Sequence, residues 1–315
     1  MASENATFGF IGLGAMGHGM AKNIALKMGD SSKLFVYDIN QEAVQNFVAE
    51  YNQNEKVNSA GSPREIAEKC DIIMTSVPKA PHVEVVFLNP STGLLAAPKT
   101  GKTLFLELST IDAGASSAIK DKLEAGGFGQ FVDAPCSGGS MGAEKGALSF
   151  MVGCADQLYP RVFEILKLMG KEDGIFHCGE SGTGLKTKLL NNYLSSITTI
   201  ATAETINIGI RGGLNAEKLN EVLNASSGMS FNSKINNPVP GLTPASPASN
   251  GYTPGFSIEL CLGVLELAVK SGNDLGAKMV LGQPMLNAYR EAAAKDIYKG
   301  KDAKIIYKWI ESGSN

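Results

Sequence analysis

Residues 8–17 read Phe-Gly-Phe-Ile-Gly-Leu-Gly-Ala-Met-Gly, an apolar run followed by three glycines spaced as GxGxxG. The run Thr7–Ile11 predicts a buried β-strand, and Met16–Lys27 predicts an amphipathic helix. A strand, a glycine-rich turn and a helix in this order are typical of a site that holds a dinucleotide pyrophosphate at the helix N-terminus. We therefore predict cofactor contacts from the loop residues Gly12, Leu13, Gly14, Ala15, Met16 and Gly17.

An acidic residue follows the second predicted strand, Lys33–Tyr37. Asp38 lies 21 residues beyond Gly17, where a carboxylate accepts hydrogen bonds from the adenosine ribose of NAD. A 2′-phosphate would meet this carboxylate, so we expect NAD, with NADP as the alternative. The competing interpretation is a packing turn with Asp38 as a strand-end cap, but Asn40 is already the candidate cap of the next helix.

Short β-branched or aromatic runs alternate with helical patterns through the first half of the chain. Further strands are expected at Asp71–Ser76, Thr103–Glu107, Gln130–Asp133, Leu148–Val152 and Ile175–His177. Further helices are expected at Gln41–Tyr51, Ser62–Glu68, Ala80–Leu88 and Ala113–Ala125. This alternation predicts an α/β, Rossmann-like domain with a mostly parallel sheet covered on both faces.

The second half has a different pattern. From Leu185 to about Ile210 the only helix-breaking residue is Gly209, which predicts a helix of about 25 residues. Later helices are expected at Ala216–Asn224, Ser257–Ser271, Val280–Lys295 and Ala303–Ser312. We predict a dinucleotide-binding domain over residues 1–180, an interdomain helix over 181–212 and an all-α domain over 213–315. The proline-rich loop 236–256 is expected to be mobile or functional.

Composition excludes several classes of protein. The net charge of −3 gives no reason to expect nucleic acid, and no apolar run is long enough to span a membrane. The five cysteines are scattered, without a CxxC pair, and the three histidines lack metal-ligand spacing, so no metal is expected. The N-terminus has no basic or apolar leader, which favours a cytoplasmic protein; a processed mitochondrial matrix form would look the same.

A second glycine-rich stretch precedes the long helix, and we expect its glycines to open the helix N-terminus to a ligand. One turn into the helix, Lys188 and Asn192 stand four residues apart and share a face. A lysine beside an amide can hold an oxygen and exchange a proton with it, as in an oxidoreductase or an aldolase. The cofactor loop favours hydride transfer, with Lys188 as its proton partner. The alternative is a solvated lysine, the interpretation we give to Lys186.

Three further loops follow predicted strands, and ligands of an open parallel sheet bind at the carboxyl ends of strands. Val77-Pro78 and Ser109-Thr110 should border the nicotinamide, unless they only end a strand and cap a helix. Backbone N–H groups around Ser137, Gly138 and Gly139 can form a nest for a substrate carboxylate, unless they are a simple glycine turn.

Taken together, these motifs identify a resemblance to the β-hydroxyacid dehydrogenase family that runs nearly end to end. It rests on Gly12–Gly17, Asp133–Gly139, Gly179–Asn192 and the loop beginning Asn237-Pro238-Val239-Pro240-Gly241. The resemblance implies a Rossmann-like domain, a long interdomain helix and a helical domain that assembles homodimers or homotetramers. It implies Lys188 as the catalytic residue with Asn192 beside it, a substrate carboxylate on Ser137, Gly138 and Gly139, and cofactor contacts from Val77, Pro78 and Thr110.

The chain departs from the family pattern at two places. Gly263-Val264 stands where the family commonly has Lys-Asp, and His82 stands beside the cofactor loop where close relatives carry asparagine. We place His82 among the cofactor contacts by position; a plain surface residue is the alternative. The leading hypothesis is NAD-dependent hydride transfer to or from a small β-hydroxy acid or its semialdehyde. The alternatives are reduction of another carbonyl or an imine, and a catalytically silent NAD(H)-binding protein.

Overall fold

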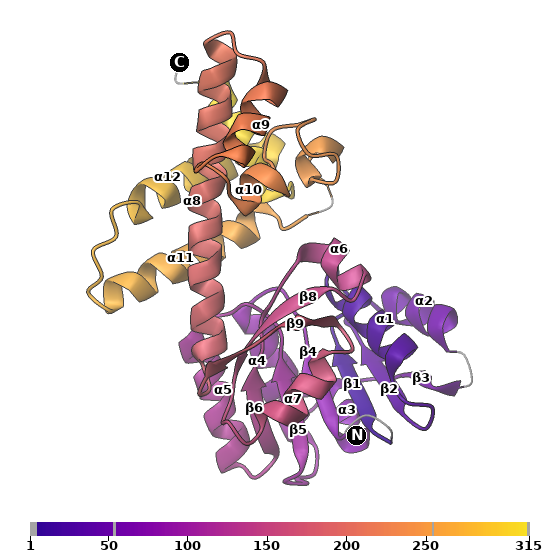
Figure 1. The fold of residues 1–315 in the computed structure, drawn as a ribbon. Helices are drawn as coiled ribbons and strands as arrows, with labels where there is room; N and C mark the ends of the chain where they lie inside the picture. The colour runs from indigo at the N-terminus through magenta and orange to yellow at the C-terminus, as the bar shows by residue number, and fades with distance from the viewer. Residues whose placement is uncertain (1–4, 53–54, 254, 314–315) are drawn as a thin grey trace. The chain divides into compact units, whose positions relative to one another are not determined.

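The computed structural model describes residues 5–52, 55–253 and 255–313. The chain separates into two compact units, Met1–Lys188 and Leu189–Asn315, which differ in secondary structure. The first unit, indigo to magenta in Figure 1, combines a sheet with helices; the second, orange to yellow, is helical. The predicted fold class is therefore confirmed.

The described part of the first unit contains one nine-stranded sheet in the order β3-β2-β1-β4-β5-β6-β8-β7, with β9 paired to β8. The strands from β1 to β6 pair in parallel, whereas β8 runs antiparallel to β6 and β7. Their bounds are β1 (Thr7–Ile11), β2 (Lys33–Tyr37), β3 (Val57–Ser59), β4 (Ile72–Thr75), β5 (Thr103–Glu107), β6 (Gly129–Asp133), β7 (Cys136–Ser137), β8 (Leu148–Gly153) and β9 (Gly170–Gly179).

Helices cover both faces of this sheet, because its side chains divide into two apolar clusters. Phe8 and Phe10 of β1 belong to one cluster with α1, and Phe105 and Phe131 belong to the other with α3, α4 and α5. A parallel sheet buried on both faces gains the hydrophobic stabilisation that these runs predict. The helices are α1 (Gly17–Lys27), α2 (Gln41–Tyr51), α3 (Pro63–Lys69), α4 (Ala80–Leu88), the 3-10 turn η2 (Leu94–Ala96), α5 (Ala113–Ala125), α6 (Gly139–Glu144) and α7 (Tyr159–Leu166).

Local signals in the sequence explain where several of these helices begin. The Asn40 side chain accepts hydrogen bonds from the N–H groups of Glu42 and Ala43 and so caps α2, as predicted. Asp112 caps α5 by accepting from the Ala115 N–H. Ser109-Thr110 is therefore not the cap of this helix, which removes the plainest alternative explanation for that dipeptide.

The second unit consists of helices and short 3-10 turns. Its elements are α8 (Thr183–Arg211, whose first residues lie in the first unit), α9 (Ala216–Ala225), α10 (Phe231–Lys234), η3 (Pro247–Asn250), α11 (Ile258–Asp274), α12 (Gly282–Ala293), η4 (Asp296–Tyr298), η5 (Ala303–Ile305) and α13 (Ile306–Ser312). The core includes Leu265, Leu286, Tyr289 and Ile306, all nearly inaccessible to solvent. The predicted long helix is present, with 29 residues.

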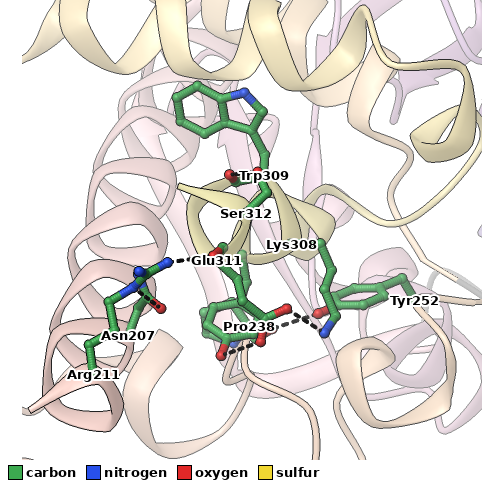
Figure 2. A network of polar contacts seen from close by, with 9 residues as sticks. Asn207, Arg211, Pro238, Tyr252, Lys308, Trp309, Glu311 and Ser312 are labelled. Carbon is green, nitrogen blue, oxygen red and sulfur yellow. Dashed lines mark hydrogen bonds and ion pairs between the residues drawn. The ribbon is translucent and has the colours of Figure 1, made fainter. Parts of the chain in front are cut away.

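A polar network ties the last turn of α8 to the C-terminal helix (Figure 2). Arg211 donates from Nη2 to the Glu311 carbonyl at 2.7 Å and from Nε to Asn207 Oδ1 at 3.3 Å. In the proline-rich segment, the Tyr252 hydroxyl donates to the Pro238 carbonyl at 3.2 Å. Tyr252 and Pro238 are both buried, so this long loop is packed into the helical unit.

Several short elements were not predicted from the sequence. They include the strands β3 and β7, with three and two residues, and the helices α6, α7 and α10. Each is too short to show a period, or overlaps a motif rich in glycine and serine. The strand expected at Ile175–His177 is longer, because β9 continues to Gly170 through register shifts against β8. Among the described residues, no helix has both the length and the apolar character to cross a membrane.

Candidate functional site

The three glycines of the first loop have different roles. A Cβ at Gly12, where φ is +100°, would lie 2.2 Å from the Ser76 carbonyl oxygen, and one at Gly17 would lie 1.8 Å from the Gly12 carbonyl oxygen. These two glycines permit close packing of the loop. A Cβ at Gly14 would meet no described atom within 4 Å. Gly14 therefore presents exposed backbone to open space, as a ligand-binding glycine requires.

The N-terminus of α1 has no side-chain cap among the residues that the structure describes. Met16 makes no capping hydrogen bond, and the first turn of α1 contains no acidic residue. Its N–H groups and the positive end of the helix dipole therefore suit a pyrophosphate. The neighbouring Ala15 is exposed, whereas Leu13 is buried beneath the loop.

Asp38 lies at the carboxyl end of β2, beside the same loop. Its Oδ2 accepts a hydrogen bond from the Leu13 N–H at 2.6 Å, and its Oδ1 accepts from the Asn40 N–H at 2.8 Å. These bonds fix the carboxylate next to the glycine turn while leaving it half-buried. A carboxylate oxygen accepts more than one hydrogen bond, so a ribose hydroxyl can bind here as well.

The tips of β4 and β5 lie in neighbouring strands, next to the point where the strand order reverses at β1. The Val77 N–H donates to Ser109 Oγ at 2.8 Å, which links the two tips. Thr110 is half-buried and Pro78 is exposed, so both are accessible. His82 lies on an exposed position of α4.

Beneath these tips lies a buried carboxyl group that the sequence did not single out. Glu107 Oε1 accepts from the Ser109 N–H at 2.7 Å, and its Oε2 accepts from the Thr75 hydroxyl. Burial raises the pKa of Glu107 to about 7, against the hydrogen bonds from Ser109 and Thr75, which lower it. One feature of the sequence could have identified Glu107: it is an acidic residue at the end of an apolar strand, two residues before Ser109-Thr110.

The expected carboxylate-binding motif is an exposed turn held next to α1. Gly138 and Gly139 have φ of +133° and +64°; Gly138 lies between β7 and α6, and Gly139 begins α6. Asn23 of α1 donates from Nδ2 to the Ala143 carbonyl of α6 at 2.9 Å. A Cβ at Gly19 would come within 2.7 Å of the α6 backbone, so only glycine permits this approach. Ser137 and the two glycines are thereby held near α1.

The start of α8 differs from our expectation that its glycines open the helix N-terminus to a ligand; that expectation was wrong. The Asp133 carboxylate accepts from the Gly182 N–H at 2.6 Å and from the Leu185 N–H at 2.9 Å. A Cβ at Gly184 would lie 2.2 Å from the Met151 carbonyl oxygen. The absence of a Cβ at Gly184 therefore lets the helix dock against the sheet, and Asp133 occupies the N–H groups of Gly182 and Leu185.

Lys188 follows one turn later and is 8 % exposed, whereas Lys186 is exposed to solvent. Burial lowers the pKa of Lys188, and its one electrostatic neighbour among the described residues is the Cys136 thiol, which acts in the opposite direction. Asn192 lies one further turn along α8, on the same face, and is half-buried. Lys188 thus has the low exposure and lowered pKa of an acid/base lysine.

The second unit contains a further buried lysine, Lys304, and the Gly263-Val264 pair. Lys304 is also 8 % exposed, and its Nζ donates to Thr199 Oγ1 at 2.7 Å and to Asn232 Oδ1 at 2.6 Å. Nothing local in the sequence marked it, since its partners lie far away in the chain. Gly263 is exposed on α11 with open space around it, and Val264 packs with Leu189.

Comparisons with known proteins agree with this geometry. Residues 7–179 match the model of the NAD binding domain of 6-phosphogluconate dehydrogenase. Residues 182–310 match the model described as NAD-binding of NADP-dependent 3-hydroxyisobutyrate dehydrogenase. Together the two models cover the glycine loop, the segment Asp133–Gly139 and α8.

Individual relatives are similar over nearly their whole length. The mitochondrial 3-hydroxyisobutyrate dehydrogenase of Mus musculus is 37 % identical, over 98 % of this chain and 88 % of the relative. The probable mitochondrial enzyme of Dictyostelium discoideum is 35 % identical, over 98 % and 92 %. The solved Mycobacterium tuberculosis 3-hydroxyisobutyrate dehydrogenase with L-serine superposes with a TM-score of 0.81 at 30 % identity, over 97 % of this chain and 99 % of that one. This chain belongs to the 3-hydroxyisobutyrate dehydrogenase branch of the β-hydroxyacid dehydrogenase family, a family of NAD(P)-dependent oxidoreductases.

Proposed function

We propose that this protein interconverts a small β-hydroxy acid and its semialdehyde, with Lys188 as the general acid/base. The names of its relatives support a 3-hydroxyisobutyrate-like substrate. L-Serine, which accompanies the Mycobacterium tuberculosis structure, is itself a small β-hydroxy acid. The observation that carries the assignment is a buried lysine of lowered pKa in the turn of α8 that follows the Asp133 hydrogen bonds.

The chain's own residues fit a nicotinamide dinucleotide. Gly14 leaves open space, α1 has an uncapped N-terminus, and Asp38 stands at the end of β2 to accept from a ribose. A carboxylate at Asp38 favours NAD over NADP. When bound, the cofactor supplies the hydride acceptor and donor. Val77, Pro78 and Thr110 are proposed to border its nicotinamide half, with His82 beside them.

The proton chemistry falls to Lys188. In oxidation its neutral amine accepts the proton of the substrate hydroxyl; in reduction its ammonium donates to the carbonyl oxygen and stabilises the developing negative charge. Burial makes the neutral amine accessible near working pH, because it disfavours the charged form. Asn192 is proposed to orient the reacting oxygen. Ser137, Gly138 and Gly139 are proposed to hold the substrate carboxylate through hydroxyl and backbone donors.

The test compares Lys188→Ala with Lys186→Ala, a matched control two residues away on the same helix. With 3-hydroxyisobutyrate and NAD, we expect kcat of Lys188→Ala to fall by about 10²- to 10⁴-fold. The NADH dissociation constant should stay unchanged, and Lys186→Ala should resemble the wild type, since Lys186 is exposed. Turnover that survives in Lys188→Ala would show that another group carries the proton.

A second candidate is favoured by one observation, the open space at Gly263. The lysine that the family commonly has at this position is absent, and we propose that its loss changes the substrate to another polar carbonyl or an imine. NADH oxidation measured against semialdehydes and cyclic imines separates the candidates. NADH binding without turnover on the whole panel would instead indicate a catalytically silent binding protein.

A further inference from the structure

Two buried carboxyl groups on neighbouring strands bond to different parts of the proposed site. We propose that Glu107 and Asp133 are positioning residues with separate tasks. Glu107 fixes the strand tips that receive the nicotinamide half of the cofactor, and Asp133 fixes the first turn of α8 and thereby Lys188. This inference rests on the proposed function, because it assumes those roles for the tips and for the lysine.

The sheet register places the two groups side by side. Glu107 and Asp133 are paired residues in the parallel ladder of β5 and β6, and Thr75 of β4 pairs with Glu107 in turn. Phe105 and Phe131, two residues earlier on these strands, point into the same apolar cluster. Because side chains alternate along a strand, Glu107 and Asp133 emerge on that same face of the sheet.

Glu107 links three segments at the tips of β4 and β5. It accepts from the Ser109 N–H and the Thr75 hydroxyl, while Ser109 Oγ accepts from the Val77 N–H. The position of the Val77-Pro78 loop thus depends on Ser109, and that of Ser109 on Glu107. A displaced loop would alter the surface offered to the cofactor but not the proton-transfer group.

Asp133 acts on the other side of the site. Its two oxygens accept from N–H groups at the start of α8. A Cβ added at Gly184 would lie 2.9 Å from Asp133 Oδ2, so the backbone of the helix passes close to this carboxylate. Lys188 lies one turn beyond Leu185, so its place above the sheet follows from this anchor. Asp133 also begins the segment that leads to Ser137, and it therefore links the lysine to the proposed carboxylate-binding turn.

The choice of carboxyl groups at these two buried positions is itself informative. Both are fully buried, and no ion pair involves either of them in residues 5–52, 55–253 and 255–313. Burial raises the pKa of each, which reflects the cost of an unpaired buried charge. Apolar side chains would avoid the burial of a carboxyl group but would leave these donors without acceptors. What the carboxyl groups add is two fixed acceptors aimed at chosen donors.

The experiment is a double comparison of kinetic constants. For Glu107→Met we expect the NADH dissociation constant and the KM for NAD to rise about 10- to 100-fold, with kcat within about threefold. Glu107→Gln keeps an acceptor for Ser109 and a partner for Thr75 and should restore wild-type binding. For Asp133→Asn we expect kcat to fall about 10- to 100-fold with unchanged NADH binding. Asp133→Ser, which keeps one small acceptor, should show the same split if the asparagine variant folds poorly.

Thr103→Val provides the control for loss of stability. Thr103 is a buried polar residue at the opposite end of β5, where its hydroxyl bonds to that of Thr100 at 2.9 Å. The Thr103→Val variant should have a lower unfolding temperature but unchanged kcat and KM. If the Glu107 and Asp133 variants change kcat and KM together, or change stability alone as Thr103→Val does, the inference is overturned.

These outcomes are distinguishable from failure of the proposed function. An active Lys188→Ala variant would refute the acid/base assignment and, with it, the task given to Asp133. The task given to Glu107 is decided separately, because NADH binding is measured without turnover.

Discussion

The two buried lysines make the sharpest comparison within this molecule. Lys188 and Lys304 are equally buried, each 8 % exposed, and burial lowers the pKa of both. Lys304 donates to Thr199 and to Asn232, whose own amide donates to the Ser195 carbonyl at 2.8 Å and to Thr198 Oγ1 at 2.7 Å. Lys188 has only the Cys136 thiol as an electrostatic neighbour among the described residues.

The difference teaches that burial by itself does not mark an acid/base group. An amine whose donors are already used by the fold stabilises that fold, since leaving its partners unsatisfied would be costly. A largely buried lysine whose amine has no such partners among the described residues still has donors to offer to a ligand. The same residue type, at the same exposure, therefore has different expected effects when it is replaced.

The largest effect should separate the two lysines in turnover. Lys188→Met is expected to lower kcat about 10²- to 10⁴-fold, while Lys304→Met keeps kcat close to that of the wild type when measured below its unfolding temperature. Methionine keeps most of the length and packing of each side chain. Steady-state kinetics of the two variants on one preparation check this. Equal losses of kcat in the two variants would show that the two lysines do not differ in their contribution to turnover.

Stability should show the reverse order. Lys304→Met is expected to lower the free energy of unfolding by about 1–3 kcal/mol, because Asn232 Oδ1 loses its donor inside the helical unit. Lys188→Met should leave that free energy unchanged or raise it, since it removes a buried amine that no described residue bonds. Urea denaturation gives both values. A larger loss in the Lys188 variant would contradict the comparison.

A third prediction concerns the pH dependence of stability. The pKa of Lys304 is about 8 in the folded protein against 10.5 ordinarily, so between these values the unfolded chain binds more protons. Stability of the wild type relative to Lys304→Met should therefore rise with pH from about 8 to 10.5, by at most about 1.4 kcal/mol per pH unit. Denaturation curves at successive pH values test the sign. Parallel curves for the two proteins would show that Lys304 does not titrate in this range.

The smallest effect is expected beside Lys188. Burial raises the pKa of the Cys136 thiol, so the thiol is neutral near pH 7 and exerts little electrostatic influence on the lysine. Cys136→Ala should therefore change kcat by less than about threefold and leave its pH profile in place. A profile of kcat from pH 6 to 9 checks this. If the part of the kcat profile assigned to Lys188 shifts by a full pH unit, Cys136 is present as a thiolate.

The sequence predicted the features that are encoded locally. The glycine turn at Gly12–Gly17, the cap at Asn40 and the run of α8 without proline each follow from neighbouring residues. The family resemblance extended this to the enzyme class, which the comparisons confirm. The roles assigned to Lys188 and to Ser137 remain predictions.

The features that sequence reasoning missed depend on contacts between distant segments. The hydrogen bond between Thr75 and Glu107 depends on the register of β4 and β5. The hydrogen bonds of Asp133 depend on the approach of α8 to the sheet. The bond from Lys304 to Thr199 spans 105 positions of the chain. No period or spacing in a single sequence reports such pairs. Gly184 was misread for this reason, since its close neighbours include backbone atoms of β6 and β8.

The boundary between the two compact units falls directly after Lys188. The glycine loop, Asp38, the strand tips, the proposed carboxylate-binding turn and this lysine thus all belong to the first unit. A chain divided at this boundary would therefore carry all of these proposed groups on one side, and Asn192 and Gly263 on the other.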